Sequence, residues 1–160
     1  MSDPVLSPAT ARDPSIEAYA RTLAAYEALN SVQRATNKAA LFAALAEAGV
    51  TEVIVTFDGY GDSGQIESMD ARAGDEPIEL PEATVPFLSA EWGTSDPVSR
   101  DLPLGEVIER LAYDYLGDTH SGWENNDGAY GEFVFDVAAA TISLDYDERY
   151  TATNNYTHEF

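Results

Sequence analysis

The chain has 160 residues, a formal net charge of −21 and no cysteine. That length suits a single domain with its own core, and the lack of cysteine excludes disulfides and thiolate chemistry. No apolar run is long enough to span a bilayer, and the N-terminus lacks the basic and apolar regions of a signal peptide. We therefore expect a cytoplasmic protein.

The negative charge is unevenly distributed along the chain. Residues 51–160 hold 24 of the 29 acids but only four of the eight bases, whereas residues 1–50 are almost neutral. A field of this sign repels phosphate backbones and anionic membrane surfaces, and it attracts basic proteins and cations. We expect no direct binding of nucleic acid or membrane, although acidity that only aids solubility is an alternative.

The first part of the chain is expected to be helical after a short tail. Residues 1–13 are interrupted by prolines and lack an apolar stripe, which predicts a mobile N-terminal tail. Asp13 before Pro14 is typical of a helix start. Helical spacing continues to about residue 30 and again over 32–48, and these two stretches either join or fold as a hairpin.

The rest of the chain alternates strand-like and loop-like segments. The expected elements are a strand at 50–57, a glycine-rich turn at 58–64, a return strand at 65–71, short strands near 77–80 and 84–88 within a loop, a helix over 103–116 ended by Gly117, a polar loop to 131, and strands at 132–137, 141–144 and 149–156. This order predicts an α+β fold in which residues 14–160 form one domain. We expect an antiparallel sheet of about four or five strands, an N-terminal hairpin plus a C-terminal meander, with the N-terminal helices and one central helix packed on one face.

The first candidate site is the glycine-rich turn that follows the first strand. Clustered carboxylates are the ligands that hard cations prefer, so Ca²⁺ or Mg²⁺ is a possible cofactor there. The candidate metal ligands are Asp58, Asp62, Glu67 and Asp127. Their spacing does not match an EF-hand, and the alternative is a tight hairpin in which the glycines adopt positive φ angles.

The second candidate site is the polar loop after the central helix. Polar loops held by a rigid scaffold often carry binding residues. The candidate binding residues are His120, Trp123, Glu124, Asn125, Asn126 and Asp127, together with Tyr60 and Asp62 from the glycine-rich turn. His120 is a candidate general base, with Glu124 or Asp127 to orient it. The alternative is an Asx-rich turn in which Trp123 caps the edge of the core.

Two segments of the chain resemble a known family. They are Val55–Glu67 (VTFDGYGDSGQIE) and Gly122–Phe133 (GWENNDGAYGEF), and the likeness extends from about Asn37 to Phe160. The family is one of unknown function, found in small bacterial proteins carried on plasmids and integrative elements. The resemblance implies a bacterial host and a mobile-element context, where small acidic proteins often inhibit host defence by imitating the charge of DNA.

Two functions are compatible with these patterns. No nucleophile elbow, HExxH motif or basic stripe is present, so we expect a non-enzymatic protein. The first hypothesis is an acidic interaction protein whose partner is a basic surface, that of a nucleic-acid-binding protein such as a restriction or CRISPR effector. The alternative is a domain that binds a divalent cation, or a metal-dependent enzyme, with its site where the 58–67 and 118–127 loops meet.

Overall fold

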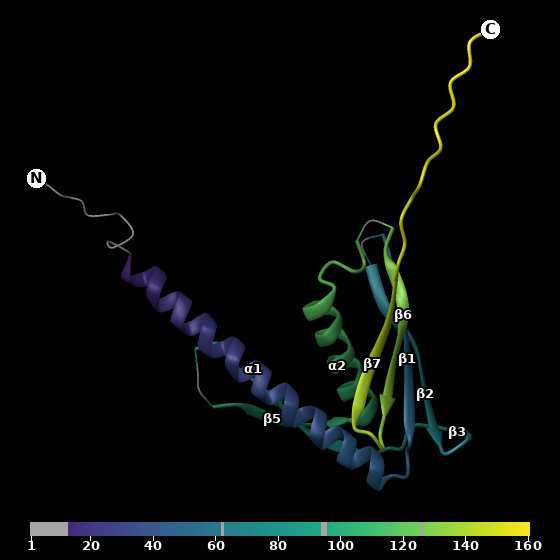
Figure 1. Cartoon of the computed structure of the whole chain (residues 1–160). Coiled ribbons are helices and arrows are strands. Elements are labelled where there is room, and N and C mark those ends of the chain that lie inside the picture. The colour runs from purple at the N-terminus through teal and green to yellow at the C-terminus, as the bar shows by residue number, and fades with distance from the viewer. Residues whose placement is uncertain (1–12, 62, 94–95, 126) are drawn as a thin grey trace, which may run out of the picture.

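A computed structural model describes residues 13–61, 63–93, 96–125 and 127–160, and this part of the chain has an α+β fold (Figure 1). Five strands form one antiparallel sheet in the order β3-β2-β1-β6-β7, and β4 pairs with β5 in a separate hairpin. The elements are α1 (Pro14–Glu47), β1 (Glu52–Tyr60), β2 (Ser63–Ala73), β3 (Glu76–Ile78), β4 (Thr84–Ser89), β5 (Val98–Pro103), α2 (Leu104–Thr119), β6 (Ala129–Asp136) and β7 (Thr141–Glu148). The predicted fold class is thus confirmed.

Helix α1 is a single helix, so of the two alternatives left open by the sequence the two helical stretches join rather than fold as a hairpin. Asp13 caps it as expected, because its carboxylate accepts a hydrogen bond of 2.9 Å from the Ser15 amide, and this bond lowers the Asp13 pKa. The residues between the two predicted helices include no Gly or Pro, so nothing breaks the hydrogen-bond ladder. The fully buried residues of α1 begin only at Gln33, and the N-terminal half extends away from the sheet (Figure 1).

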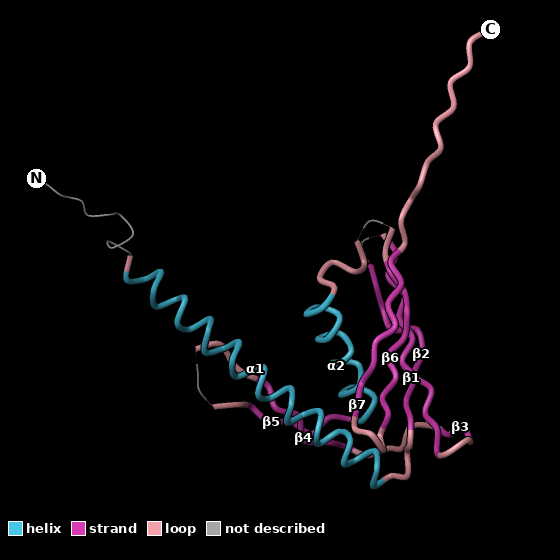
Figure 2. Tube along the Cα trace, in the orientation of Figure 1, coloured by secondary structure: helices cyan, strands magenta, loops and turns pink. Residues whose placement is uncertain are grey.

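The core lies between the two helices and one face of the five-stranded sheet. Residues alternate along β1, so that Val53, Val55 and Phe57 are buried while their neighbours face outwards. Phe133 and Phe135 of β6 pair directly with Val55 and Val53 of β1, and they extend the buried face of the sheet across β6. Helix α2 contributes a buried stripe to this core, and the C-terminal half of α1 covers it further (Figure 2).

The structure differs from the expected elements at the end of α2, at β5 and over residues 149–156. Helix α2 continues past Gly117 to Thr119, since one glycine costs a helix only about 1 kcal/mol. Strand β5 was not predicted because its sequence is polar, with only Leu102 buried. Residues 149–156 form no strand: they continue beyond β7, which is already the sheet edge, and residues 150–160 are exposed. The expected mobile tail over 1–13 lies, except for Asp13, outside the described residues.

Candidate functional site

The two predicted loops meet at one end of the sheet, and Trp123 joins them. Gly59 of β1 pairs directly with Gly64 of β2, and the indole ring lies against both. A Cβ atom built on Gly59 would lie 2.5 Å from Trp123 Cζ3, and one on Gly64 would lie 2.4 Å from Cη2. The ring also meets Phe57 edge-on at 5.4 Å and is only 8% exposed. These glycines therefore make room for a buried tryptophan.

Gly128 fixes the other end of the loop against the same hairpin. It has a φ of 79°, and a Cβ there would lie 1.8 Å from the Gly59 carbonyl oxygen. Its amide donates to Asn125, and its carbonyl accepts from the amide of Arg149. Only glycine combines that backbone conformation with so close an approach. The loop is consequently held against the hairpin by backbone contacts of Gly128.

His120 packs on an aromatic ring in this loop. Its ring stacks face to face on Tyr146 of β7, with centroids 3.6 Å apart and planes 5° apart. Burial, followed by the charges of Glu148 and Glu124, raises the Tyr146 pKa above its usual value. Both rings line a shallow cavity of about 180 Å³, along with Trp123. Stacking of this kind positions the imidazole but is not the hydrogen bond through which a carboxylate orients a general base.

Asp58 is paired with a cation of the chain itself. Arg149 Nη1 lies 2.9 Å from its Oδ1, and the same nitrogen donates to the Gly59 carbonyl at 3.0 Å. The guanidinium also lies 4.6 Å from the centre of the Tyr130 ring. Arg149 therefore fastens the start of the C-terminal segment to β1 and β6, and Asp58 has a cationic partner from the chain itself.

The other predicted ligands do not converge with Asp58. Glu67 is the extra residue of a bulge in β2 and accepts from the side chain of Gln65, whereas the carboxylate of Asp127 accepts from Thr151. Tyr60 is 76% exposed at the end of β1, and Glu124 is half-buried beside Trp123. Asp62 and Asn126 lie outside the described residues. Within the described ranges, no group of three or more acidic or histidine side chains could hold a metal ion.

The side of the sheet away from the helices is strongly acidic. Strand pairing places every second residue of β1, β2, β6 and β7 on this side, where no helix covers them (Figure 2). We call its seven carboxylates the acidic face: Glu52, Asp58, Asp70, Glu132, Asp136, Asp145 and Asp147. Two arginines accompany the acidic face: Arg72 lies on the same side of β2, and Arg149 follows directly after β7. Arg149 already pairs with Asp58.

The arrangement of the acidic face works against folding. Glu52 stands directly opposite Asp136, and Glu132 stands directly opposite Asp145 on neighbouring strands. Like charges opposite one another destabilise a sheet by about 0.2–1 kcal/mol per pair. At the centre of the face, Ile54 lies opposite Val134, and both are partly exposed. A small apolar centre within a charged surround is the usual anatomy of a protein–protein interface.

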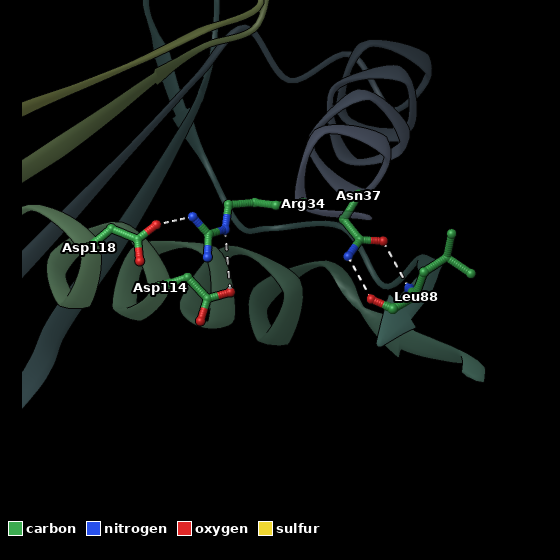
Figure 3. A network of polar contacts seen from close by, with 5 residues as sticks. All are labelled: Arg34, Asn37, Leu88, Asp114 and Asp118. Carbon is green, nitrogen blue, oxygen red and sulfur yellow. Dashed lines mark hydrogen bonds and ion pairs between the residues drawn. The ribbon is translucent and has the colours of Figure 1, made fainter. Parts of the chain in front are cut away.

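Helix α1 makes two polar contacts that the sequence did not indicate, one with α2 and one with β4. Arg34 of α1 pairs with Asp118 and lies 4.0 Å from Asp114, both on α2 (Figure 3). Burial raises the Asp114 pKa, an effect that Arg34 partly opposes. Asn37 holds the backbone of Leu88 through two hydrogen bonds. A polar stripe at helical spacing on α1, formed by Asn30, Gln33, Arg34 and Asn37, is the signal that could have marked the α1 positions.

These features define a small α+β domain with an uncovered, acidic sheet face and a tightly packed loop at one sheet end. The chain belongs to a family of unknown function, DUF6878, whose model matches residues 33–160. The match begins at Gln33, where the fully buried residues of α1 begin. No curated protein and no solved structure matches the chain. In the described part of the chain, no helix is long and apolar enough to cross a membrane.

Proposed function

We propose that this protein is a non-enzymatic interaction protein whose acidic face binds the basic surface of a nucleic-acid-binding protein. The observation that carries the proposal is the gathering of seven carboxylates on the one sheet face that no helix covers. Opposed pairs such as Glu132 and Asp145 weaken the sheet, so folding alone does not favour them. Recognition of a cationic surface does favour them.

The geometry suits competition with nucleic acid. Side chains on one face of a strand recur about every 6.7 Å, and neighbouring strands lie about 4.8 Å apart, so carboxylates on the sheet form a two-dimensional array. Such an array attracts the lysines and arginines that contact phosphates. The resemblance to proteins of mobile elements makes restriction and CRISPR effectors of a bacterial host the partners to examine first.

The proposal is tested by displacement of DNA. Fluorescence anisotropy follows a labelled duplex bound to each of a panel of restriction and CRISPR effectors while the protein is titrated in. We expect displacement from at least one effector, with an apparent affinity that falls steeply as salt is raised, because steering between charges is screened. If the protein displaces DNA from none of the effectors at low salt, the proposed partner class is refuted.

A further inference from the structure

A second site lies on the helix side of the molecule, away from the acidic face. A pocket of about 390 Å³ lies between α1, α2 and the end of β4. This volume is within the range of about 300–1,000 Å³ that is usual for ligand pockets. Aromatic rings from Tyr26, Phe87 and Tyr113 line it together with the side chain of Gln33. Charged side chains, Arg34, Arg110 and Asp114, line it as well, so the pocket combines aromatic rings with a primary amide and charged groups.

The Gln33 amide is buried without a partner. The residue is 4% exposed, and neither its Oε1 nor its Nε2 makes a hydrogen bond within the described part of the chain. Buried polar groups are almost always paired, because each unpaired one lowers stability. An unpaired donor and acceptor on one planar group, in the wall of a pocket, indicate a ligand that offers the complementary pair.

One helical turn further along α1, Asn37 shows what such an amide binds here. Its Nδ2 donates to the Leu88 carbonyl at 2.9 Å, and its Oδ1 accepts from the Leu88 amide at 2.8 Å (Figure 3). The side-chain amide of Asn37 thus forms hydrogen bonds with both backbone groups of one residue in an extended strand. Strand β4 ends at Ser89, and Gln33, four residues before Asn37 on the same helix, has no such backbone partner.

We propose that this pocket binds an extended peptide segment of another protein, whose backbone N–H and C=O pair with Gln33 as those of Leu88 pair with Asn37. The charges at the rim are compensated, since Arg34 pairs with Asp118 and Arg110 lies 3.1 Å from Glu106. An uncharged backbone fits this rim better than a phosphate or a carboxylate does. The aromatic walls accept an apolar side chain of the same segment.

The test uses the whole protein and NMR. The tripeptide acetyl-Ala-Leu-Ala-amide is titrated into ¹⁵N-labelled protein while the side-chain NH₂ signals of Gln33 are followed, together with the backbone amide signals of Leu88 and Ser89, which line the same pocket and remain in every variant. We expect saturable shifts in these signals, and affinity at least about tenfold weaker in Gln33→Met, which keeps the chain length and removes the amide. Gln65→Met, which changes an exposed glutamine on β2, is the matched control and should bind like the wild type.

Stability separates a ligand site from a structural one. If Gln33 serves a ligand, Gln33→Met should melt at the same or a higher temperature, because an unpaired buried amide has been removed. A lower melting temperature would overturn the proposal. Ala90→Phe, which fills the pocket without changing Gln33, should also abolish binding, and binding that survives it would likewise overturn the proposal.

Two further titrations identify the ligand class. A peptide of residues 149–160 tests whether the exposed C-terminal segment of a second copy is the source, and tighter binding than that of the tripeptide would overturn the assignment to another protein in favour of self-association. Adenine also presents an adjacent donor and acceptor to a glutamine side chain. Binding of adenine in preference to both peptides, or no saturable shift with either peptide, would refute the peptide assignment.

Discussion

The contact between Trp123 and the paired glycines allows a quantitative test of the site's architecture. Truncating a buried tryptophan to alanine costs about 3–5 kcal/mol, and Trp123 is 8% exposed, so Trp123→Ala should fall in that range. Gly64→Ala alone should destabilise by about 1–3 kcal/mol, because its Cβ would lie 2.4 Å from the indole and the ring would have to move.

The variant that combines Trp123→Ala with Gly64→Ala provides a sharper test. Gly64 has no positive φ, and alanine is about 0.5–1 kcal/mol better than glycine inside a strand, but its Cβ would still lie 2.9 Å from Glu124 Cβ once the indole is gone. Gly64→Ala should therefore cost less in the Trp123→Ala background than in the wild type, with a coupling of at least about 0.5 kcal/mol between the two substitutions. The coupling is measured by urea denaturation, followed by far-UV circular dichroism, of the wild type, the two single variants and the double variant. Additive effects would show that the indole does not rest on Gly64.

Three other predictions concern charges. Glu132→Gln should raise the free energy of unfolding in urea by about 0.2–1 kcal/mol, because it relieves repulsion with Asp145, and a loss of stability would contradict the cross-strand pairing. Burial raises the Asp114 pKa, so the native state binds the proton more tightly, and stability falls as the pH rises from the usual carboxylate pKa through the raised one. Asp114→Asn should make that fall shallower, and an unchanged pH profile of the melting temperature would refute this. Arg149→Ala should cost about 1–2 kcal/mol in urea denaturation because it removes the contacts with Asp58 and the Gly59 carbonyl, and an unchanged stability would show that these contacts are solvent-screened.

The fold was largely predictable because its elements carry local signals. Apolar residues alternate along β1 and form a stripe on α2, and each pattern indicates which face of the element is buried. The start of α1 at Asp13 follows from a local capping pattern. The strand β5 and the exposed segment after Glu148 could not be read in this way. β5 buries a single residue, and the segment is rich in tyrosine and threonine but lies beyond the sheet edge.

The meeting of the two glycine-containing loops was predictable from the sequence, but the contacts that hold them together were not. The sequence indicated that the two glycine-containing loops meet, and the structure brings them together through Trp123. It did not indicate that Arg149 pairs with Asp58 and donates to the Gly59 carbonyl, since Arg149 lies 90 positions after Gly59 and their meeting depends on strand order. For the same reason the acidic face emerges only from strand pairing, because its carboxylates come from four strands.

The central claim is that the arrangement of the carboxylates, and not the total charge, makes the binding surface. Its most direct test compares two variants of equal net charge. One carries Glu132→Gln, Asp136→Asn and Asp145→Asn on the acidic face. The other carries Glu17→Gln, Glu27→Gln and Glu109→Gln, three exposed positions on the helices. Both variants are compared by displacement of duplex DNA from the effector on which the wild-type protein competes most strongly in the panel described above.

We predict that the acidic-face variant competes at least about tenfold more weakly than the wild type, while the helix variant competes within about twofold of it. A shallower dependence of affinity on salt should accompany the loss, because fewer charges then meet the partner. Equal weakening of the two variants would contradict the account, since it would show that only the net charge of the chain matters.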